Sequence, residues 1–149
     1  MRIYLDNCCY NRPYDDKSLL TNNLESQAKL FIQDQIKQET FELVSSYMLH
    51  YEVFQTPDVT RRLAIMQFIE AHSSIHVGKE WKQTVEANAK EIMARGIKFK
   101  DACHVASAIM AHCDYFITTD KRLLKYHSDV IAIINPVDFV MQMEVSHEQ

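Results

Sequence analysis

Glycine and proline are scarce in this chain, which has two glycines and three prolines in 149 residues. So few turn-forming residues argue against a loop-rich, all-β fold. Neither Gly-x-Gly-x-x-Gly nor the phosphate-binding Gly-Lys-Ser/Thr motif occurs in the sequence. Because those motifs cradle phosphates with glycine backbone, nucleotide sites of these two kinds are excluded.

Long apolar runs and zinc-binding patterns are also absent from the sequence. No stretch approaches the roughly 20 apolar residues that span a bilayer, and the N-terminus lacks the basic and apolar regions of a signal peptide. There is no Cys-x-x-Cys pair and no His-Glu-x-x-His motif. We therefore expect a cytoplasmic protein whose four cysteines are free, buried thiols: Cys8, Cys9, Cys103 and Cys113.

The net charge of −4 is unfavourable for a protein that binds nucleic acid. Local patches matter more than the total, however, and two basic clusters are present. Arg95, Lys98 and Lys100 precede one acid, and Lys121, Arg122 and Lys125 follow another. These clusters are either solvated helix ends or contacts for a polyanion, and the sequence leaves both open.

Short apolar runs alternate with amphipathic segments along the chain, and 47% of the residues are hydrophobic. This alternation predicts parallel strands joined by right-handed crossovers, with helices on both faces. We therefore predict one domain over residues 1–149 with an α/β fold, a three-layer α/β/α sandwich around a short parallel sheet. The predicted strands cover about 2–6, 41–45, 75–77, 115–118 and 130–134, and the predicted helices cover 24–38, 48–54, 59–71, 80–95, 101–112, 120–126 and a segment from 136 onward.

Four acids end or interrupt the apolar elements. Asp6 ends the first predicted strand, Asp120 follows the strand at 115–118, and Glu52 and Asp101 lie on helical segments. Ligands of open parallel sheets bind beyond the carboxyl ends of the strands, where Asp6 and Asp120 lie. If the four acids converge, they form an oxygen-rich pocket suited to Mg²⁺ or Mn²⁺.

Each acid also has a purely structural interpretation, which the sequence leaves open. Asp6 could stabilise a turn, and Glu52 could face water from a helix. Asp101 could be a first-turn acid that the helix dipole favours, and Asp120 could cap the next helix.

Four segments carry a resemblance to a known family. They are Ile3–Asp6, Glu52–Phe54, Asp101–Ala108 and Phe116–Leu123, and they resemble the PIN-domain family over nearly the whole chain. The resemblance implies strand order 3-2-1-4-5 and an Mg²⁺- or Mn²⁺-dependent ribonuclease, often a VapC-type toxin neutralised by an antitoxin and commonly a homodimer. At Asn7 the chain departs from the commonest toxin pattern, in which a threonine or serine follows the first aspartate, and this suggests a distinct subgroup.

These observations together predict an endoribonuclease that hydrolyses RNA phosphodiester bonds, either as the toxin of a toxin–antitoxin pair or as a solitary nuclease. Asp6, Asp101 and Asp120 are the predicted metal ligands, and Glu52 is a ligand or orients the attacking water. Six further residues are predicted to support these acids or to contact RNA: Asn7, Arg12, Thr118, Thr119, Lys121 and Arg122.

Three alternative functions compete with this prediction. A non-catalytic PIN-like module, binding nucleic acid or protein, would be expected to lack one of the acids. An aspartyl phosphatase would require Asp-x-Asp after the first strand, where this chain has Asp6-Asn7-Cys8. A DNA flap nuclease typically carries longer insertions than 149 residues accommodate.

Overall fold

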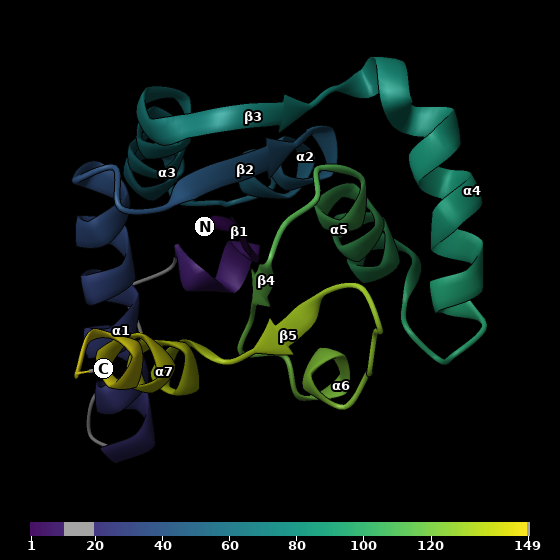
Figure 1. The fold of residues 1–149 in the computed structure, drawn as a ribbon. Coiled ribbons are helices and arrows are strands. Elements are labelled where there is room, and N and C mark those ends of the chain that lie inside the picture. The colour runs from purple at the N-terminus through teal and green to yellow at the C-terminus, as the bar shows by residue number, and fades with distance from the viewer. Residues whose placement is uncertain (11–19, 149) are drawn as a thin grey trace.

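The computed structural model describes residues 1–10 and 20–148, and it contains a five-stranded parallel sheet (Figure 1). The strand order is β3-β2-β1-β4-β5, which confirms the order that the resemblance implied. The strands are β1 Arg2–Leu5, β2 Glu42–Ser46, β3 Ser73–Val77, β4 Tyr115–Ile117 and β5 Ala132–Ile134.

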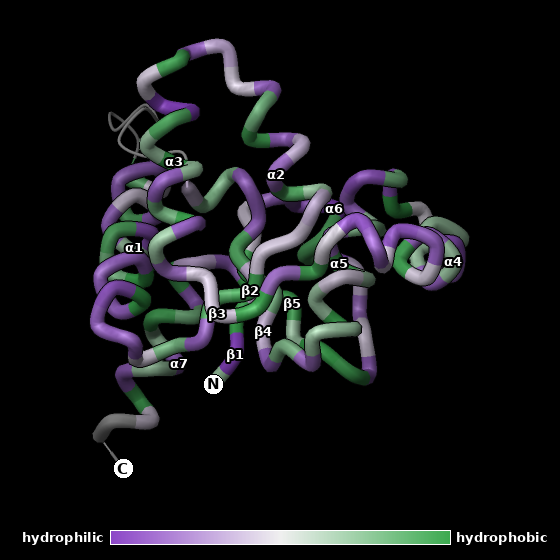
Figure 2. The backbone as a smooth tube through the Cα atoms, turned by 90° about the horizontal axis from the view of Figure 1, so that it is seen from above, coloured by the Kyte–Doolittle hydropathy of each residue, from purple (hydrophilic) through white to green (hydrophobic). Residues whose placement is uncertain are grey.

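Helices cover both faces of the sheet, as a parallel sheet requires (Figure 2). One layer consists of α1 Leu20–Lys37, α3 Val59–His72 and α7 Pro136–Glu148, and the other consists of α4 Lys82–Met93, α5 Phe99–Met110 and α6 Lys121–Leu124. Successive side chains of β1 enter opposite cores: Tyr4 packs in the α4–α5 core, whereas Ile3 and Leu5 pack in the α1–α3 core. The predicted three-layer sandwich is thereby confirmed.

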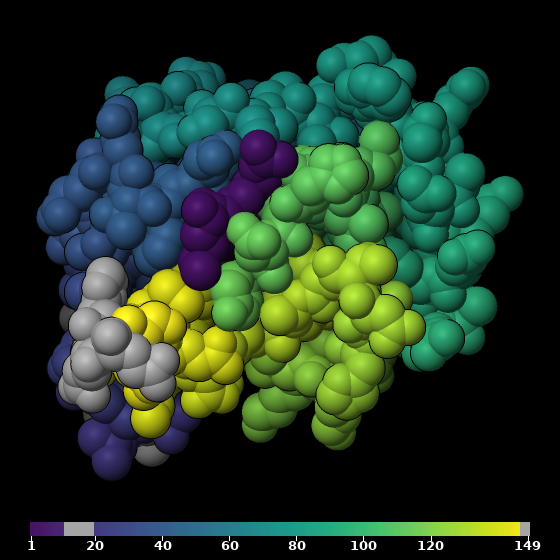
Figure 3. All heavy atoms as spheres, viewed as in Figure 1, coloured from purple at the N-terminus to yellow at the C-terminus, as the bar shows by residue number. Residues whose placement is uncertain are grey.

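β1 is the central strand, and its first residues are hydrogen-bonded on both sides. The Glu42 backbone N–H donates to the Met1 carbonyl, and the Asp114 N–H donates to the Arg2 carbonyl. The Arg2 guanidinium also donates to the Ala111 carbonyl at 2.6 Å. Figure 3 shows the first residues (purple) at the centre of the visible face, between segments from the middle and the later part of the chain. This amino end of the sheet is therefore tightly bonded, and the predicted site residues lie at the opposite end.

Short connections lead from the strands into the helices at the carboxyl edge. α2 Tyr47–Phe54 follows β2 directly, and the Ser46 hydroxyl caps it by accepting from the Leu49 N–H at 3.1 Å. The 3₁₀ helix η1, Asn7–Cys9, follows β1 in the same way, with Asp6 at its N-cap. These two connections place Asp6 and the α2 residues close to the sheet.

Several predicted boundaries were wrong by a few residues. α1 begins at Leu20, four residues before the predicted start, and the helix predicted over 80–95 is divided into the 3₁₀ helix η2, Lys79–Trp81, and α4. Gly96 adopts φ +93°, which favours glycine and ends the turn after α4. No helix in the described part of the chain is long and apolar enough to cross a membrane.

Candidate metal centre

The four predicted acids line a single cavity of about 340 Å³ beyond the carboxyl ends of β1 and β4. Asn7, Cys8 and Thr119 complete its wall. Asp6 comes from the end of β1, Asp120 from the loop after β4, Glu52 from α2 and Asp101 from the first turn of α5. The fold therefore brings together residues that are up to 114 positions apart in the chain, between Asp6 and Asp120.

Asp6 is the most buried of the four acids, with 6% of its surface exposed. Its Oδ1 accepts from the Asn7 N–H at 2.8 Å, and its Oδ2 accepts from the Thr118 hydroxyl at 2.8 Å. The Thr118 hydroxyl also accepts from the Asp120 N–H at 3.0 Å. Thr118 thus connects the carboxylate after β1 to the loop after β4 and fixes the orientation of Asp6.

Asp120 caps α6, so the structural interpretation of this residue is correct. Its Oδ1 accepts from the backbone N–H groups of Arg122 at 2.8 Å and Leu123 at 3.2 Å. Both hydrogen bonds are accepted by Oδ1, so Oδ2 takes no part in capping the helix. Capping therefore holds the carboxylate at the wall of the cavity and remains compatible with metal binding.

Asp101 lies in the first turn of α5 but does not cap the helix, because the N-cap is Lys98. Burial, together with repulsion from Asp6 and Asp120, raises the pKa of Asp101 to about 6. The Asp101 carboxyl is therefore partly protonated just below neutral pH, as expected for a buried acid that lies close to other acids without a cation.

Glu52 is held by a buried hydrogen-bond network that the sequence did not reveal. Its carboxylate pairs with Nε2 of His104, a fully buried residue. Nδ1 of His104 lies 2.5 Å from the Tyr4 hydroxyl, which lies 2.6 Å from the Ser46 hydroxyl. The interpretation of Glu52 as an unpartnered, water-facing residue is therefore wrong.

The charges of this network follow from its geometry. Burial acts to raise the pKa of Glu52, but the hydrogen bond from His104 and the positive charges of His104 and Lys100 outweigh it, so the pKa is lowered. Burial acts to lower the pKa of His104, but the Glu52 bond and the nearby carboxylates raise it overall. A charged Glu52 paired with a protonated His104 is the favoured state. His104 lies three positions after Asp101 on the same helix face, and this spacing is the one feature that could have pointed to it.

The donor set fits a hard divalent cation. It consists of carboxylate oxygens, and the Asn7 Oδ1 is buried at the cavity wall without a hydrogen-bond partner. Within residues 1–10 and 20–148, no three His, Cys, Asp or Glu side chains already form a compact ligand cluster. The like charges of the four acids repel one another, and a bound cation would offset that repulsion.

The remaining predicted residues differ in position. Thr119 lines the cavity, whereas Lys121 and Arg122 are exposed at the start of α6 and do not line it. Arg12 lies outside the described residues. Their contact with RNA stays a prediction.

The cysteines are free, as expected, but one of them has an unexpected position. Cys9, Cys103 and Cys113 are buried, whereas Cys8 is half-buried and lines the acid cavity. The Cys8 Sγ lies 3.8 Å from Asp6 Oδ2 and 3.8 Å from the Thr118 hydroxyl. A thiol therefore borders the carboxylates.

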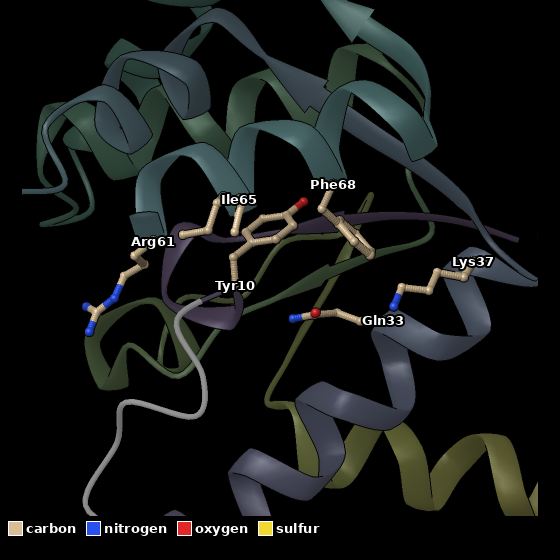
Figure 4. Close-up of a pocket in the computed structure, with 7 residues that line it drawn as sticks. Tyr10, Gln33, Lys37, Arg61, Ile65 and Phe68 are labelled. Atoms are coloured by element: carbon tan, nitrogen blue, oxygen red, sulfur yellow. The ribbon is translucent and has the colours of Figure 1, made fainter. Parts of the chain in front are cut away.

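A second cavity, of about 200 Å³, lies between α1 and α3 (Figure 4). The Tyr10 ring extends toward Ile65 and Phe68 of α3, and Gln33 and Lys37 of α1 lie on the other side. No acid lines this cavity, so it is not a second metal site of the same kind.

The sequence matches no family model and no curated protein. Solved structures of similar fold include the following two. One is VapBC2 from Rickettsia felis bound to a DNA fragment from its promoter, with TM-score 0.53, 15% identity and coverage of 91% of this chain and 98% of that chain. The other is FitAcB from Neisseria gonorrhoeae, with TM-score 0.50, 15% identity and coverage of 90% and 97%.

The chain has a PIN-domain fold. The strand order and the helices on both faces agree with this assignment and confirm the resemblance found in the sequence. In this PIN fold the acid cavity lies beyond the carboxyl ends of the central strands, where open parallel sheets bind their ligands.

Proposed function

We propose that this PIN-fold chain is a divalent-metal-dependent endoribonuclease. The observation that carries the proposal is the convergence of four acids from four segments on one cavity, where burial and mutual repulsion raise the pKa of Asp101 to about 6. Such crowding lowers the stability of the metal-free fold, and its chemistry suits a site that binds a cation.

Asp6, Asp101 and Asp120 would hold Mg²⁺ or Mn²⁺. The ion would lower the pKa of a bound water and offset the charge that develops on the phosphate. Asp6 presents its carboxylate to the cavity because Thr118 and the Asn7 N–H fix it, and Asp120 does so because the α6 N-terminus fixes it. These contacts fix the orientation of two of the three carboxylates that would bind the ion.

Glu52 would orient the attacking water and accept its proton. Its lowered pKa keeps the carboxylate charged, which a proton acceptor requires. His104 fixes that carboxylate from the buried side, so the other edge of Glu52 faces the cavity. This arrangement separates the proton-accepting group from the three acids that would bind metal.

The solved structures of similar fold support one of the proposed partners, and the exposed apolar side chains support the other. Both solved structures of similar fold are toxin–antitoxin complexes, which supports a toxin role and an antitoxin partner for this chain. Leu24 and Phe31 of α1 and Leu63 of α3 are exposed, which supports self-association as a homodimer.

A cleavage assay on total RNA tests the proposal. Purified protein should cleave RNA with Mg²⁺ or Mn²⁺ and not with EDTA, and Asp6→Asn should reduce cleavage to background. Asp129→Asn changes an exposed acid outside the cavity and should cleave as wild type does. Cleavage that persists in EDTA would refute the metal mechanism. RNA binding without cleavage under every condition would instead indicate a non-catalytic PIN-like module.

A further inference from the structure

A third cavity, of about 390 Å³, adjoins the acid cavity. We call it the lysine–aromatic pocket and define it by Met48, Tyr51, Lys79, Lys82, Phe99 and Lys100. Consecutive residues of two helices line the two cavities: α2 contributes Tyr51 to this pocket and Glu52 to the acid cavity. α5 likewise contributes Lys100 to this pocket and Asp101 to the acid cavity. A chain that crosses the acids would therefore continue into the lysine–aromatic pocket.

Two exposed aromatic rings line this pocket. Tyr51 is 51% exposed and Phe99 is 42% exposed, although both line the cavity. Among the residues that the structure describes, five aromatic side chains are highly exposed, and four of them lie on α2, η2 or the start of α5: Tyr51, Phe54, Trp81 and Phe99. Exposed rings beside a cavity are platforms on which the bases of a single strand can stack.

The charge of the pocket is opposite to that of the acid cavity. Three lysines line it, against the single acid Glu86, although the whole chain has a net charge of −4. The Lys100 ammonium lies 5.1 Å from the centroid of the Tyr51 ring, a cation–π contact that holds this charge at the aromatic wall. A concentration of positive charge on an acidic protein favours phosphate groups at this place.

We propose that the lysine–aromatic pocket binds a nucleobase of single-stranded RNA, next to the phosphate that the acids hydrolyse. Tyr51 and Phe99 stack on the base, and Lys79 and Lys82 contact the adjoining phosphates. The inference rests on the proposed ribonuclease function and narrows its substrate to unpaired RNA, because bases inside a duplex are not free to stack on protein rings. The volume of the pocket, about 390 Å³, lies in the range of about 300–1,000 Å³ that is typical of small-molecule sites.

Fluorescence anisotropy with a labelled, mixed-sequence single-stranded RNA tests this proposal. The titrations are made in EDTA so that the RNA stays intact. Tyr51→Ala and Phe99→Ala should each weaken binding about 5- to 150-fold, the loss expected when a base loses its stacking ring. Met141→Ala removes an exposed apolar side chain on α7, in the other helical layer from α4 and α5, and should bind as wild type does.

The lysine contribution is measured from the salt dependence of the same binding. Lys82→Ala should reduce the slope of log K against log salt by about 0.7, the contribution of one phosphate contact on a single strand. Lys90→Ala changes an exposed lysine of the same helix that does not line the pocket, so its slope should not change.

Two results would overturn the proposal. One is unchanged RNA binding by both Tyr51→Ala and Phe99→Ala, which would leave the exposed rings to a protein partner. The other is equally tight binding of a duplex of the same sequence. Neither result depends on metal, whereas the ribonuclease proposal is tested by cleavage in Mn²⁺, so the two failures can be told apart.

Discussion

Asp101→Asn should stabilise the metal-free protein at alkaline pH and not at acidic pH. The pKa of Asp101 is about 6 in the folded protein and 3.8 in the unfolded chain. This difference corresponds to at most about 3 kcal/mol of unfolding free energy. Because the carboxyl is only partly buried, solvent screening reduces this to about 1–2 kcal/mol. Loss of a first-turn acid offsets about 0.5 kcal/mol, which leaves a net gain of about 1 kcal/mol.

The sign of the pH dependence follows from proton binding. A raised pKa in the fold means that the native state binds more protons than the unfolded state between about pH 4 and pH 6. Ionisation of Asp101 therefore destabilises the fold, and the penalty is complete above about pH 7 and absent below about pH 4. Asp101→Asn removes that penalty only where it exists.

Thermal unfolding followed by circular dichroism measures this effect. In EDTA near pH 8, Asp101→Asn should melt about 2–4 °C above wild type, and near pH 4 the two should coincide. Mn²⁺ at a hundredfold excess over its Kd should stabilise wild type by about 2.7 kcal/mol, and the variant should lose much of that gain. Asp129→Asn serves as the control and should show neither effect. A lower melting temperature for Asp101→Asn at both pH values, or a full Mn²⁺ shift, would refute the reasoning.

Three other predictions concern the network, the thiols and assembly. His104→Gln should lower RNA cleavage about 10- to 100-fold at unchanged RNA affinity, because it releases Glu52 without touching the lysine–aromatic pocket. The melting temperature should not depend on reducing agent, because all four cysteines are free. Light scattering at micromolar concentration should give twice the 17.4 kDa chain mass, because apolar side chains such as Leu24 and Leu63 are exposed on α1 and α3.

Each of these predictions has a result that contradicts it. A wild-type cleavage rate for His104→Gln would show that the buried network does not position Glu52. Stoichiometric zinc in the purified protein, or melting that depends on reducing agent, would contradict free structural thiols. A monomeric mass would contradict self-association.

The sheet could be predicted because each of its strands appears in the sequence as a short apolar run. Short apolar runs that alternate with amphipathic segments require parallel strands and two helical layers, and the structure has both. The boundaries were less predictable, because they depend on local hydrogen bonds. α1 is already helical at Leu20, four residues before its predicted start, and the η2–α4 division depends on backbone geometry that hydropathy does not record.

The acids could be predicted from their places at strand ends, but their environments could not. Asp120 both caps α6 and lines the cavity, so the two interpretations of this residue were not alternatives. His104 was missed because its partners, Tyr4 and Glu52, are 100 and 52 positions away. The lysine–aromatic pocket was missed for the same reason, since α2, η2 and α5 meet only in the fold.

Isothermal titration calorimetry with Mn²⁺ tests the central claim most directly, which is that the four acids form a divalent-metal centre. Wild type should bind Mn²⁺ saturably, and Asp6→Asn should bind it far more weakly because it replaces the most buried carboxylate of the cavity. Asp129→Asn should bind as wild type does. Equal Mn²⁺ affinity in wild type and Asp6→Asn, or no saturable binding by wild type, would contradict the account.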